Sequence, residues 1–212
     1  MGIITKIESQ KKRDDRVNIY IDEKFFMAIY KELVFTFNLK KGQEIDPNNL
    51  KSILDNEMYM KAKNKALSIL SKASQSEKQI RQKLAKDYEE DTIDRVIEFL
   101  QKYKFVDDED LASRIVNTNV NLNKYGKNKI KQNLYNKGID SEDISHAISN
   151  IDSNVEFENA IYLAKKRYER IKNEDKRKIY QKLSQHLAYK GFGYDTIKSV
   201  LNKILNFDEY EY

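Results

Sequence analysis

Apolar residues recur along most of the chain at the spacing of an amphipathic helix. Stripes with offsets 0, 3, 4 and 7 begin at residues 93, 144 and 197, at intervals of 51 and 53 residues. These offsets place side chains on one face of a helix of 3.6 residues per turn. The three stripes are Ile93, Val96, Ile97 and Leu100; Ile144, Ala147, Ile148 and Ile151; and Ile197, Val200, Leu201 and Ile204.

Two further stripes precede each of these and recur with them. The nearer one is a pair spaced i, i+4: Ile80 and Leu84, Ile130 and Leu134, Leu183 and Leu187. The farther one is a triplet: Ala62, Ala66 and Leu70; Ala112, Val116 and Val120; Ala160, Ala164 and Tyr168. Self-similarity at a fixed period is the signature of a repeat architecture. The pattern therefore predicts three tandem repeats of three helices each.

The turn between the second and third helices also recurs, in two of the three repeats. It reads Lys137-Gly138-Ile139 in the second repeat and Lys190-Gly191-Phe192 in the third. A glycine just past a helix end adopts the left-handed conformation that closes the helix. The first repeat has Lys86-Asp87-Tyr88 instead, so we expect its second helix to end differently.

Polar residues mark two helix starts. Ser76 with Gln79 matches a capping box, in which each side chain accepts from the backbone N–H of the other residue. Asp107 and Asp108 stand before the first helix of the second repeat, where aspartate is a preferred N-cap.

The N-terminal part has a different period. Residues 3–7 and 17–21 alternate apolar and polar side chains in part, which predicts a β-hairpin. Residues 25–28 predict a third short strand, and residues 30–38 a short helix. Pro47 suits the first turn of a long helix that runs on towards the first repeat.

Together these elements predict a mainly α protein. We expect three tandem three-helix repeats in an elongated curved array, after a small N-terminal region that contains a β-hairpin. The predicted boundaries are 1–56 for the N-terminal region, 57–105, 106–152 and 153–206 for the repeats, and 207–212 for an acidic tail.

Composition narrows the class of protein. The 212 residues include no cysteine, which excludes disulfides and thiolate metal sites. No segment approaches the roughly 20 apolar residues of a membrane span, and the first ten residues lack the apolar core of a signal peptide. We therefore expect a cytoplasmic protein that does not enter a membrane.

Charge is distributed unevenly around a net value of +5. Residues 124–137 hold five lysines and no acid, and residues 165–178 hold eight basic residues against three acids. Residues 86–110 hold ten acids against four bases. The middle and C-terminal parts are therefore expected to attract a polyanion or an acidic protein surface.

The chain resembles the RecX family of recombination regulators. The resemblance rests on residues 129–139 and 182–192, on Phe105-Val106-Asp107-Asp108, and on Tyr125-Gly126. It covers roughly residues 57–205, and the N-terminal hairpin region looks like the extension of longer members. The first repeat departs from the pattern at its missing Lys-Gly turn.

The resemblance implies a regulatory role. A RecX-like protein is expected to bind RecA and RecA filaments on single-stranded DNA, and mostly to inhibit recombinase and ATPase activity in recombination and DNA repair. It is also expected to contact the phosphates of both single-stranded and double-stranded DNA. The alternative is a general nucleic-acid-binding helical-repeat protein without a RecA partner.

The basic residues of repeats two and three are the candidate contacts for DNA or the RecA filament. A lysine row opposite an apolar row is also what any soluble helix shows, so a plain solvated face remains an alternative. The candidates are Lys124, Lys127, Lys131, Lys165, Lys166, Arg167, Arg170, Arg177 and Lys178.

Catalytic chemistry has little support. His146 and His186 each lie within a predicted helix without a motif partner. The carboxylates at 107–110 lie at a helix start, where acids favour the positive end of the helix dipole, and we prefer this interpretation to a metal site. The 14 tyrosines suit thin cores better than base stacking. We expect a monomeric protein that is not an enzyme and needs no cofactor or metal.

Overall fold

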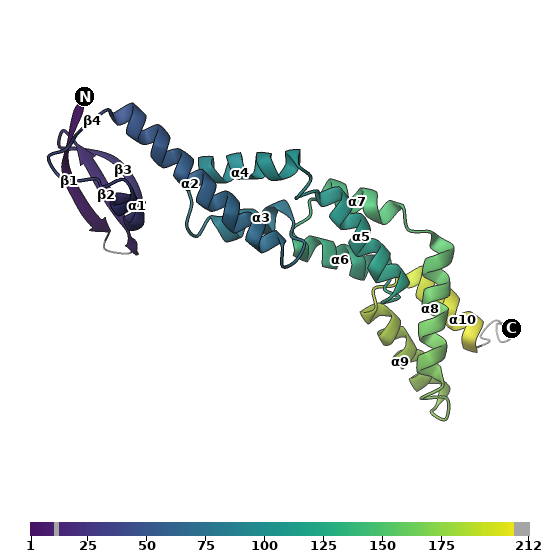
Figure 1. The fold of residues 1–212 in the computed structure, drawn as a ribbon. Coiled ribbons are helices and arrows are strands. Elements are labelled where there is room, and N and C mark those ends of the chain that lie inside the picture. Colours follow the sequence, from purple (N-terminus) through teal and green to yellow (C-terminus); the bar gives the residue numbers. More distant parts are fainter. Residues whose placement is uncertain (11–12, 206–212) are drawn as a thin grey trace. The chain divides into compact units, whose positions relative to one another are not determined.

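The computed structural model describes residues 1–10 and 13–205 (Figure 1). The predicted acidic tail at 207–212 lies outside these residues. The chain divides into two compact units. One comprises Met1–Leu67 with Leu84–Val96, and the other comprises Ser68–Lys83 with residues 97–205.

The first unit is built on a small antiparallel sheet. Its strands are β1 (Gly2–Gln10), β2 (Arg13–Ile21), β3 (Lys24–Tyr30) and β4 (Glu44–Ile45), in the order β3-β2-β1-β4. The register pairs Ile7 with Ile19 between β1 and β2, and Ile19 with Met27 between β2 and β3. This confirms the predicted hairpin and the third strand.

Two helices complete the first unit's core. Helix α1 (Lys31–Thr36) buries Leu33, and α2 (Pro47–Leu70) buries Leu50, Leu54 and Met58 in the same cluster as the sheet's isoleucines. Pro47 starts α2 as predicted, because a first-turn residue needs no N–H donor. Helix α2 continues without a break through the apolar triplet of the first repeat, where Ala62 and Ala66 are fully buried.

Eight further helices follow in the described part of the chain. Together with α2, which is the first helix of repeat one, they confirm a mainly α protein with three three-helix repeats. They are α3 (Glu77–Leu84), α4 (Glu90–Lys102), α5 (Asp108–Asn121), α6 (Lys127–Lys137), α7 (Ser141–Ser149), α8 (Ser153–Tyr168), α9 (Lys176–Tyr189) and α10 (Tyr194–Leu205). The second helix of each repeat buries its i, i+4 pair completely.

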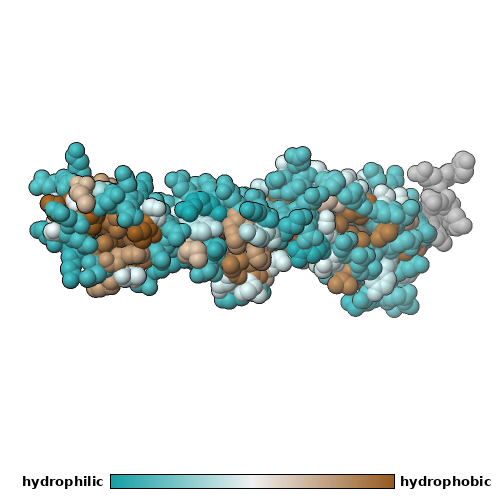
Figure 2. Space-filling view, turned by 45° about the horizontal axis from the view of Figure 1, so that its top comes forward, coloured by the Kyte–Doolittle hydropathy of each residue, from teal (hydrophilic) through white to brown (hydrophobic). Residues whose placement is uncertain are grey.

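Repeats two and three each have an apolar core of their own. One cluster joins α5, α6 and α7 through residues such as Val116, Leu134 and Ile144. The other joins α8, α9 and α10 through residues such as Ala164, Leu187 and Val200. The visible surface is mostly hydrophilic, and apolar side chains gather there only in patches (Figure 2). Such thin cores are typical of repeats that contact only their neighbours.

Helix ends follow the sequence signals with one correction. Ser76 and Gln79 form the capping box, with Ser76 Oγ accepting from Gln79 N at 3.2 Å. Gly138 and Gly191 have φ angles of +82° and +91°, as expected for the turn glycines. Asp107 caps α5, accepting from Asp110 N at 3.0 Å. Asp108 does not share this role, because its carboxylate caps a different helix, α3.

Candidate functional site

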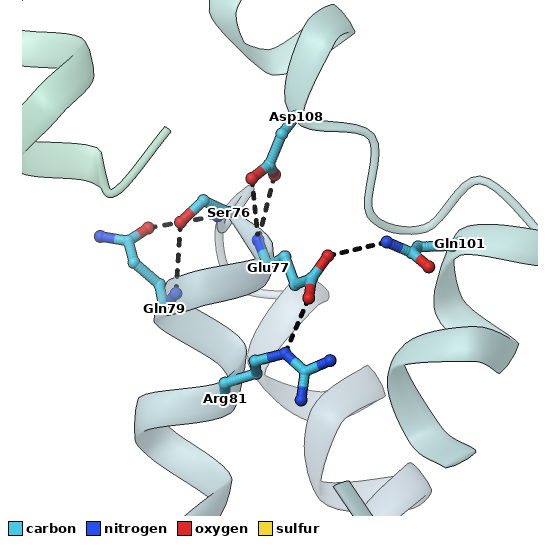
Figure 3. Close-up of polar contacts among 6 residues, drawn as sticks. All are labelled: Ser76, Glu77, Gln79, Arg81, Gln101 and Asp108. Atoms are coloured by element: carbon cyan, nitrogen blue, oxygen red, sulfur yellow. Dashed lines mark hydrogen bonds and ion pairs between the residues drawn. The ribbon is translucent and has the colours of Figure 1, made fainter. Parts of the chain in front are cut away.

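The start of α3 is held by residues of the second repeat, and we call this contact the first joint (Figure 3). Ser76 Oγ donates to the carbonyl of Lys137 at 2.5 Å. The backbone N–H of Glu77 donates to both carboxylate oxygens of Asp108, at 3.0 and 3.3 Å. The first N–H groups of a helix have no partner within it, so the second repeat supplies the cap that α3 needs.

The start of α6 is held in the same way by residues of the third repeat, which defines the second joint. The N–H of Gly126 donates to the carbonyl of Lys190 at 3.0 Å, and the N–H of Asn128 donates to that of Gly191 at 3.0 Å. The N–H of Lys127 donates to Oε1 of Glu156 at 2.9 Å. Both Lys-Gly turns are thus docking points for the preceding repeat.

The glycines of the second joint allow two backbones to touch. A Cβ at Gly126 would lie 2.5 Å from the carbonyl oxygen of Gly191. A Cβ at Gly191 would lie 2.3 Å from the backbone nitrogen of Lys129. These separations leave no room for a side chain, so the Tyr-Gly and Lys-Gly motifs are two halves of one contact.

Glu156 is a functional residue of the joint that the sequence reasoning missed. It is buried on α8, yet it caps α6 and its Oε2 lies 3.8 Å from Nζ of Lys127. A signal was present: Asp108 and Glu156 each stand four residues before the first alanine of their repeat's triplet, Ala112 and Ala160.

The Asp108 carboxylate is electrostatically unfavoured where it lies. Burial raises its pKa above the ordinary value, and the hydrogen bond from Glu77 N opposes the rise. The charges of Glu77, Asp143 and Asp140 add to it. The side chain of Glu77 faces away from this carboxylate and binds Arg81 Nε at 2.7 Å and Gln101 Nε2 at 2.7 Å (Figure 3).

The candidate cations of the second repeat differ in their surroundings. Lys131 is exposed on α6, whereas Lys127 is half-buried and faces Glu156. Lys124 precedes the helix in a left-handed conformation, with φ +56°. Because Lys127 is partly neutralised, Lys131 is the α6 candidate most open to a partner.

A hollow of about 780 Å³ lies beside the first joint, within the second unit. Lys78 of α3 and Lys131 of α6 both line it, and Tyr135, Ile139 and Ile144 supply apolar surface. Tyr135 is 73% exposed. Two lysines therefore stand beside an accessible aromatic ring on one concave surface.

The candidate cations of the third repeat lie on two helices. Lys165 and Lys166 are exposed in the last turn of α8, Arg167 is half-buried there, and Arg170 follows the helix. Arg177 and Lys178 are exposed in the first turn of α9, where Asp175 caps the helix through Arg177 N at 2.9 Å. The structure thus places Arg167 and Arg170 at the end of α8, and it places Arg177 and Lys178 at the start of α9.

Residues 1–10 and 13–205 hold no group of three or more histidine or acidic side chains placed to bind a metal ion. They also hold no helix with the length and hydropathy of a membrane span.

The arrangement defines a class of protein: tandem three-helix repeats, of which the second and the third each cap the one before, with cations on the outer faces. Four family models cover most of the chain, namely the regulatory protein RecX N-terminal domain at residues 2–46 and the first, second and third RecX three-helix domains at residues 62–100, 107–148 and 154–201. The chain belongs to the RecX family.

Full-length relatives agree with these matches. The chain is 69% identical to a protein of Clostridioides difficile named regulatory protein RecX, over 211 residues and 100% of both chains. It is 43% identical to the regulatory protein RecX of Clostridium tetani, over 97% of this chain and 95% of that one.

Solved structures match as well. A crystal structure of regulatory protein RecX has a TM-score of 0.66 and 32% identity, covering 94% of this chain and 98% of that chain. A crystal structure of RecX from Lactobacillus salivarius also has a TM-score of 0.66, with 30% identity over 73% of this chain and 99% of that chain.

Proposed function

We propose that this protein is a non-enzymatic, monomeric regulator that acts in the cytoplasm, binds RecA filaments on single-stranded DNA, and limits their growth and ATP hydrolysis. The observation that carries the proposal is membership of the RecX family over the whole length of the chain. Repeats that dock only on their neighbours form long, adaptable surfaces, which suit a helical filament.

Charges at two helix starts support a polyanionic or acidic partner. The first turn of α6 holds Lys127 and Lys129, and that of α9 holds Lys176, Arg177 and Lys178. Cations are unfavourable at the positive end of a helix dipole. Helix stability therefore does not account for them, whereas binding to phosphates or to an acidic protein surface does.

The cations of α8 have a second explanation. Lys165, Lys166 and Arg167 lie in the last turn, where positive charge stabilises the helix by about 0.3–1 kcal/mol. Their role in binding therefore needs a direct test, and charge reversal of all three is the sharpest one. It also removes their favourable dipole interaction, so folding is checked in parallel by circular dichroism.

The central experiment is a titration of RecA ATP hydrolysis on single-stranded DNA. We expect inhibition at amounts well below one protein per RecA protomer, with shorter filaments by electron microscopy. A general DNA-binding protein without a RecA partner would inhibit only near saturation of the strand. Inhibition confined to saturating amounts would therefore favour that second function and reject the first.

The site is tested by the triple variant Lys165→Glu, Lys166→Glu and Arg167→Glu. We expect it to stay folded, to inhibit only at much higher concentration, and to show a smaller dependence on salt, because fewer counterions are released. A folded variant with unchanged inhibition and unchanged binding would remove α8 from the contact surface.

A further inference from the structure

We propose that the ends of α8 and α9 form a phosphate-binding site that holds a backbone phosphate of a single-stranded nucleic acid and takes up a proton when it does so. The inference rests on the proposed function, because it assigns one phosphate contact within it. We call the site the α8–α9 cation cluster; its members are Arg167, Arg170, His186 and Lys190.

The repeat register brings Arg167 and His186 together. They occupy the positions of Asn119 and Asn133 in the second repeat, whose side chains form a hydrogen bond at 3.1 Å. Arg167 lies in the last turn of α8, and the N–H of Arg170 donates to its carbonyl at 3.1 Å. His186 lies in the last turn of α9, and the N–H of Lys190 donates to its carbonyl at 3.0 Å. The two helices pack through one apolar cluster that includes Ala164, Leu183 and Leu187.

The acids of the segment between the helices are engaged elsewhere. Glu169 binds Lys172 at 2.8 Å, and Glu174 binds Lys182 at 2.5 Å. Asp175 caps the start of α9. Within residues 13–205, no carboxylate forms an ion pair with Arg167, Arg170 or Lys190. The cluster therefore keeps its positive charge without an internal counterion.

Arg167 supplies a donor that lacks an acceptor. Its Nε is buried and has no hydrogen-bond partner among the described residues. Buried polar groups are nearly always paired, and a charged donor without an acceptor is costly. A phosphate oxygen is a suitable acceptor, because guanidinium and phosphate form strong charge-assisted hydrogen bonds.

His186 reports the same positive potential. Burial lowers the pKa of its imidazole, and the charges of Lys190, Arg167 and Arg170 lower it further. All three are members of the cluster: Arg167 lies in the last turn of α8, Arg170 follows that helix, and Lys190 is the C-cap of α9. An anion bound among them would reverse this effect, so the pKa of His186 should rise when a phosphate binds.

Neighbouring aromatic rings favour a nucleic-acid strand over a protein carboxylate as the source of the anion. Nζ of Lys190 lies 5.0 Å from the ring centre of Tyr125. Nζ of Lys129 lies 5.9 Å from that of Tyr189, which is 74% exposed. An exposed ring beside cations can stack a base while the cations hold the phosphate.

The test is a histidine NMR titration of the full-length protein. The chain has only two histidines, and His146 is an internal control because it lies exposed beside Glu109, at 3.5 Å. We expect saturable shifts and a raised pKa at His186 with inorganic phosphate and with oligothymidylate, and no such change at His146. If oligothymidylate leaves His186 unmoved, or only inorganic phosphate moves it, the nucleic-acid site is rejected.

Two single variants distinguish a specific contact at Arg167 from a general effect of positive charge. We expect Arg167→Gln to weaken oligothymidylate binding about tenfold, the loss of one charge-assisted hydrogen bond. The control Lys198→Gln removes an exposed lysine of α10 that is not among the charges acting on His186, and we expect less than about a twofold change. Equal effects of the two would overturn the site.

The proton linkage gives an independent readout. Because the pKa of His186 in the free protein lies below the ordinary histidine value, wild-type binding should strengthen several-fold as pH falls through the ordinary histidine range and should continue to strengthen below about pH 6. His186→Gln should remove this dependence. A wild-type profile that is as flat as that of the variant would overturn proton uptake at His186. A wild-type protein that does not inhibit RecA but shows the raised pKa of His186 with oligothymidylate would reject the proposed function alone. A wild-type protein that inhibits RecA but shows no change at His186 would reject this site alone.

Discussion

The first repeat differs from the other two at the turn after its second helix. Repeats two and three have Lys137-Gly138 and Lys190-Gly191 there, whereas repeat one has Asp87-Tyr88. The two glycine turns accept the helix start of the preceding repeat through the carbonyls of Lys137, Lys190 and Gly191. The first repeat follows a sheet rather than another repeat, and its turn has different partners.

These partners lie within the first unit. The hydroxyl of Tyr30, at the end of β3, donates to the carbonyl of Asp87 at 2.9 Å. The ammonium of Lys65 pairs with the Asp87 carboxylate, and the ring of Tyr88 packs edge-on against that of Tyr30, with centroids 6.1 Å apart. Aspartate and tyrosine thus replace glycine because they meet side chains rather than a helix start.

The capping acid follows the same rule. Asp108 and Glu156 each cap the preceding repeat, and the equivalent position of the first repeat is Met58, four residues before Ala62. Met58 is buried in the first unit's apolar core. The departure of repeat one therefore reflects what precedes it, and a glycine turn with an acid four residues before the triplet marks a repeat that caps another.

The largest expected effect comes from filling the second joint with Gly191→Ala. The residue has φ +91°, and its new Cβ would meet the backbone of Lys129. Left-handed strain of about 1–2 kcal/mol adds to overpacking of about 1–3 kcal/mol. We expect the free energy of unfolding to fall by about 2–5 kcal/mol in a denaturant titration.

Gly193→Ala is the matched control, because its Cβ would meet no atom within 4 Å of the described structure. We expect a change within about 0.5 kcal/mol, as for an ordinary surface substitution. If the two variants lost the same stability, close backbone approach would not be what the Lys-Gly turn provides.

The sequence predicted the helices better than their joints. Period and spacing identify the buried stripes, because a helix must bury one face whatever lies beside it. The partners of Glu77 and Lys127 lie one repeat further on, and periodicity within a helix does not indicate which neighbour supplies a cap. Asp108 was therefore predicted as a cap for its own helix, and the role of Glu156 was missed. The candidate cations could be predicted from charge alone. The missing acceptor of Arg167 Nε and its proximity to His186 could not be predicted in this way.

A smaller effect is expected at the first joint. Asp108→Ala removes the acceptor for Glu77 N, which should lower stability by about 0.5–2 kcal/mol. Asp108→Asn keeps an acceptor and cannot ionise. The pKa of Asp108 is raised in the folded protein. Between the ordinary pKa of aspartate and this raised value, the folded state therefore binds more protons than the unfolded state. The free energy of unfolding of the wild type should fall as pH rises through this range.

Denaturant titrations between about pH 3 and pH 7 compare the three proteins. The free energy of unfolding of the asparagine variant should not include this decrease, so it should rise relative to that of the wild type as pH rises. The difference should be well under about 1 kcal/mol, because the carboxyl is only half-buried. The alanine variant should lie below both at neutral pH. An asparagine variant as unstable there as the alanine variant would mean that the cap to α3 requires a charge.

The smallest effect is expected where repeat one meets the sheet. Tyr30→Phe removes the hydroxyl that donates to Asp87 but keeps the ring that packs on Tyr88, so we expect a loss of about 0.5–1.5 kcal/mol. Tyr20→Phe is the control in the same unit, because the Tyr20 hydroxyl forms no hydrogen bond with the described residues, and its loss should be nearly neutral. Thermal melts of the two variants measure the difference. A Tyr30 variant as stable as the Tyr20 variant would show that ring packing and the Lys65 ion pair alone anchor this turn, and that the first repeat needs no counterpart of the carbonyl contacts at the other joints.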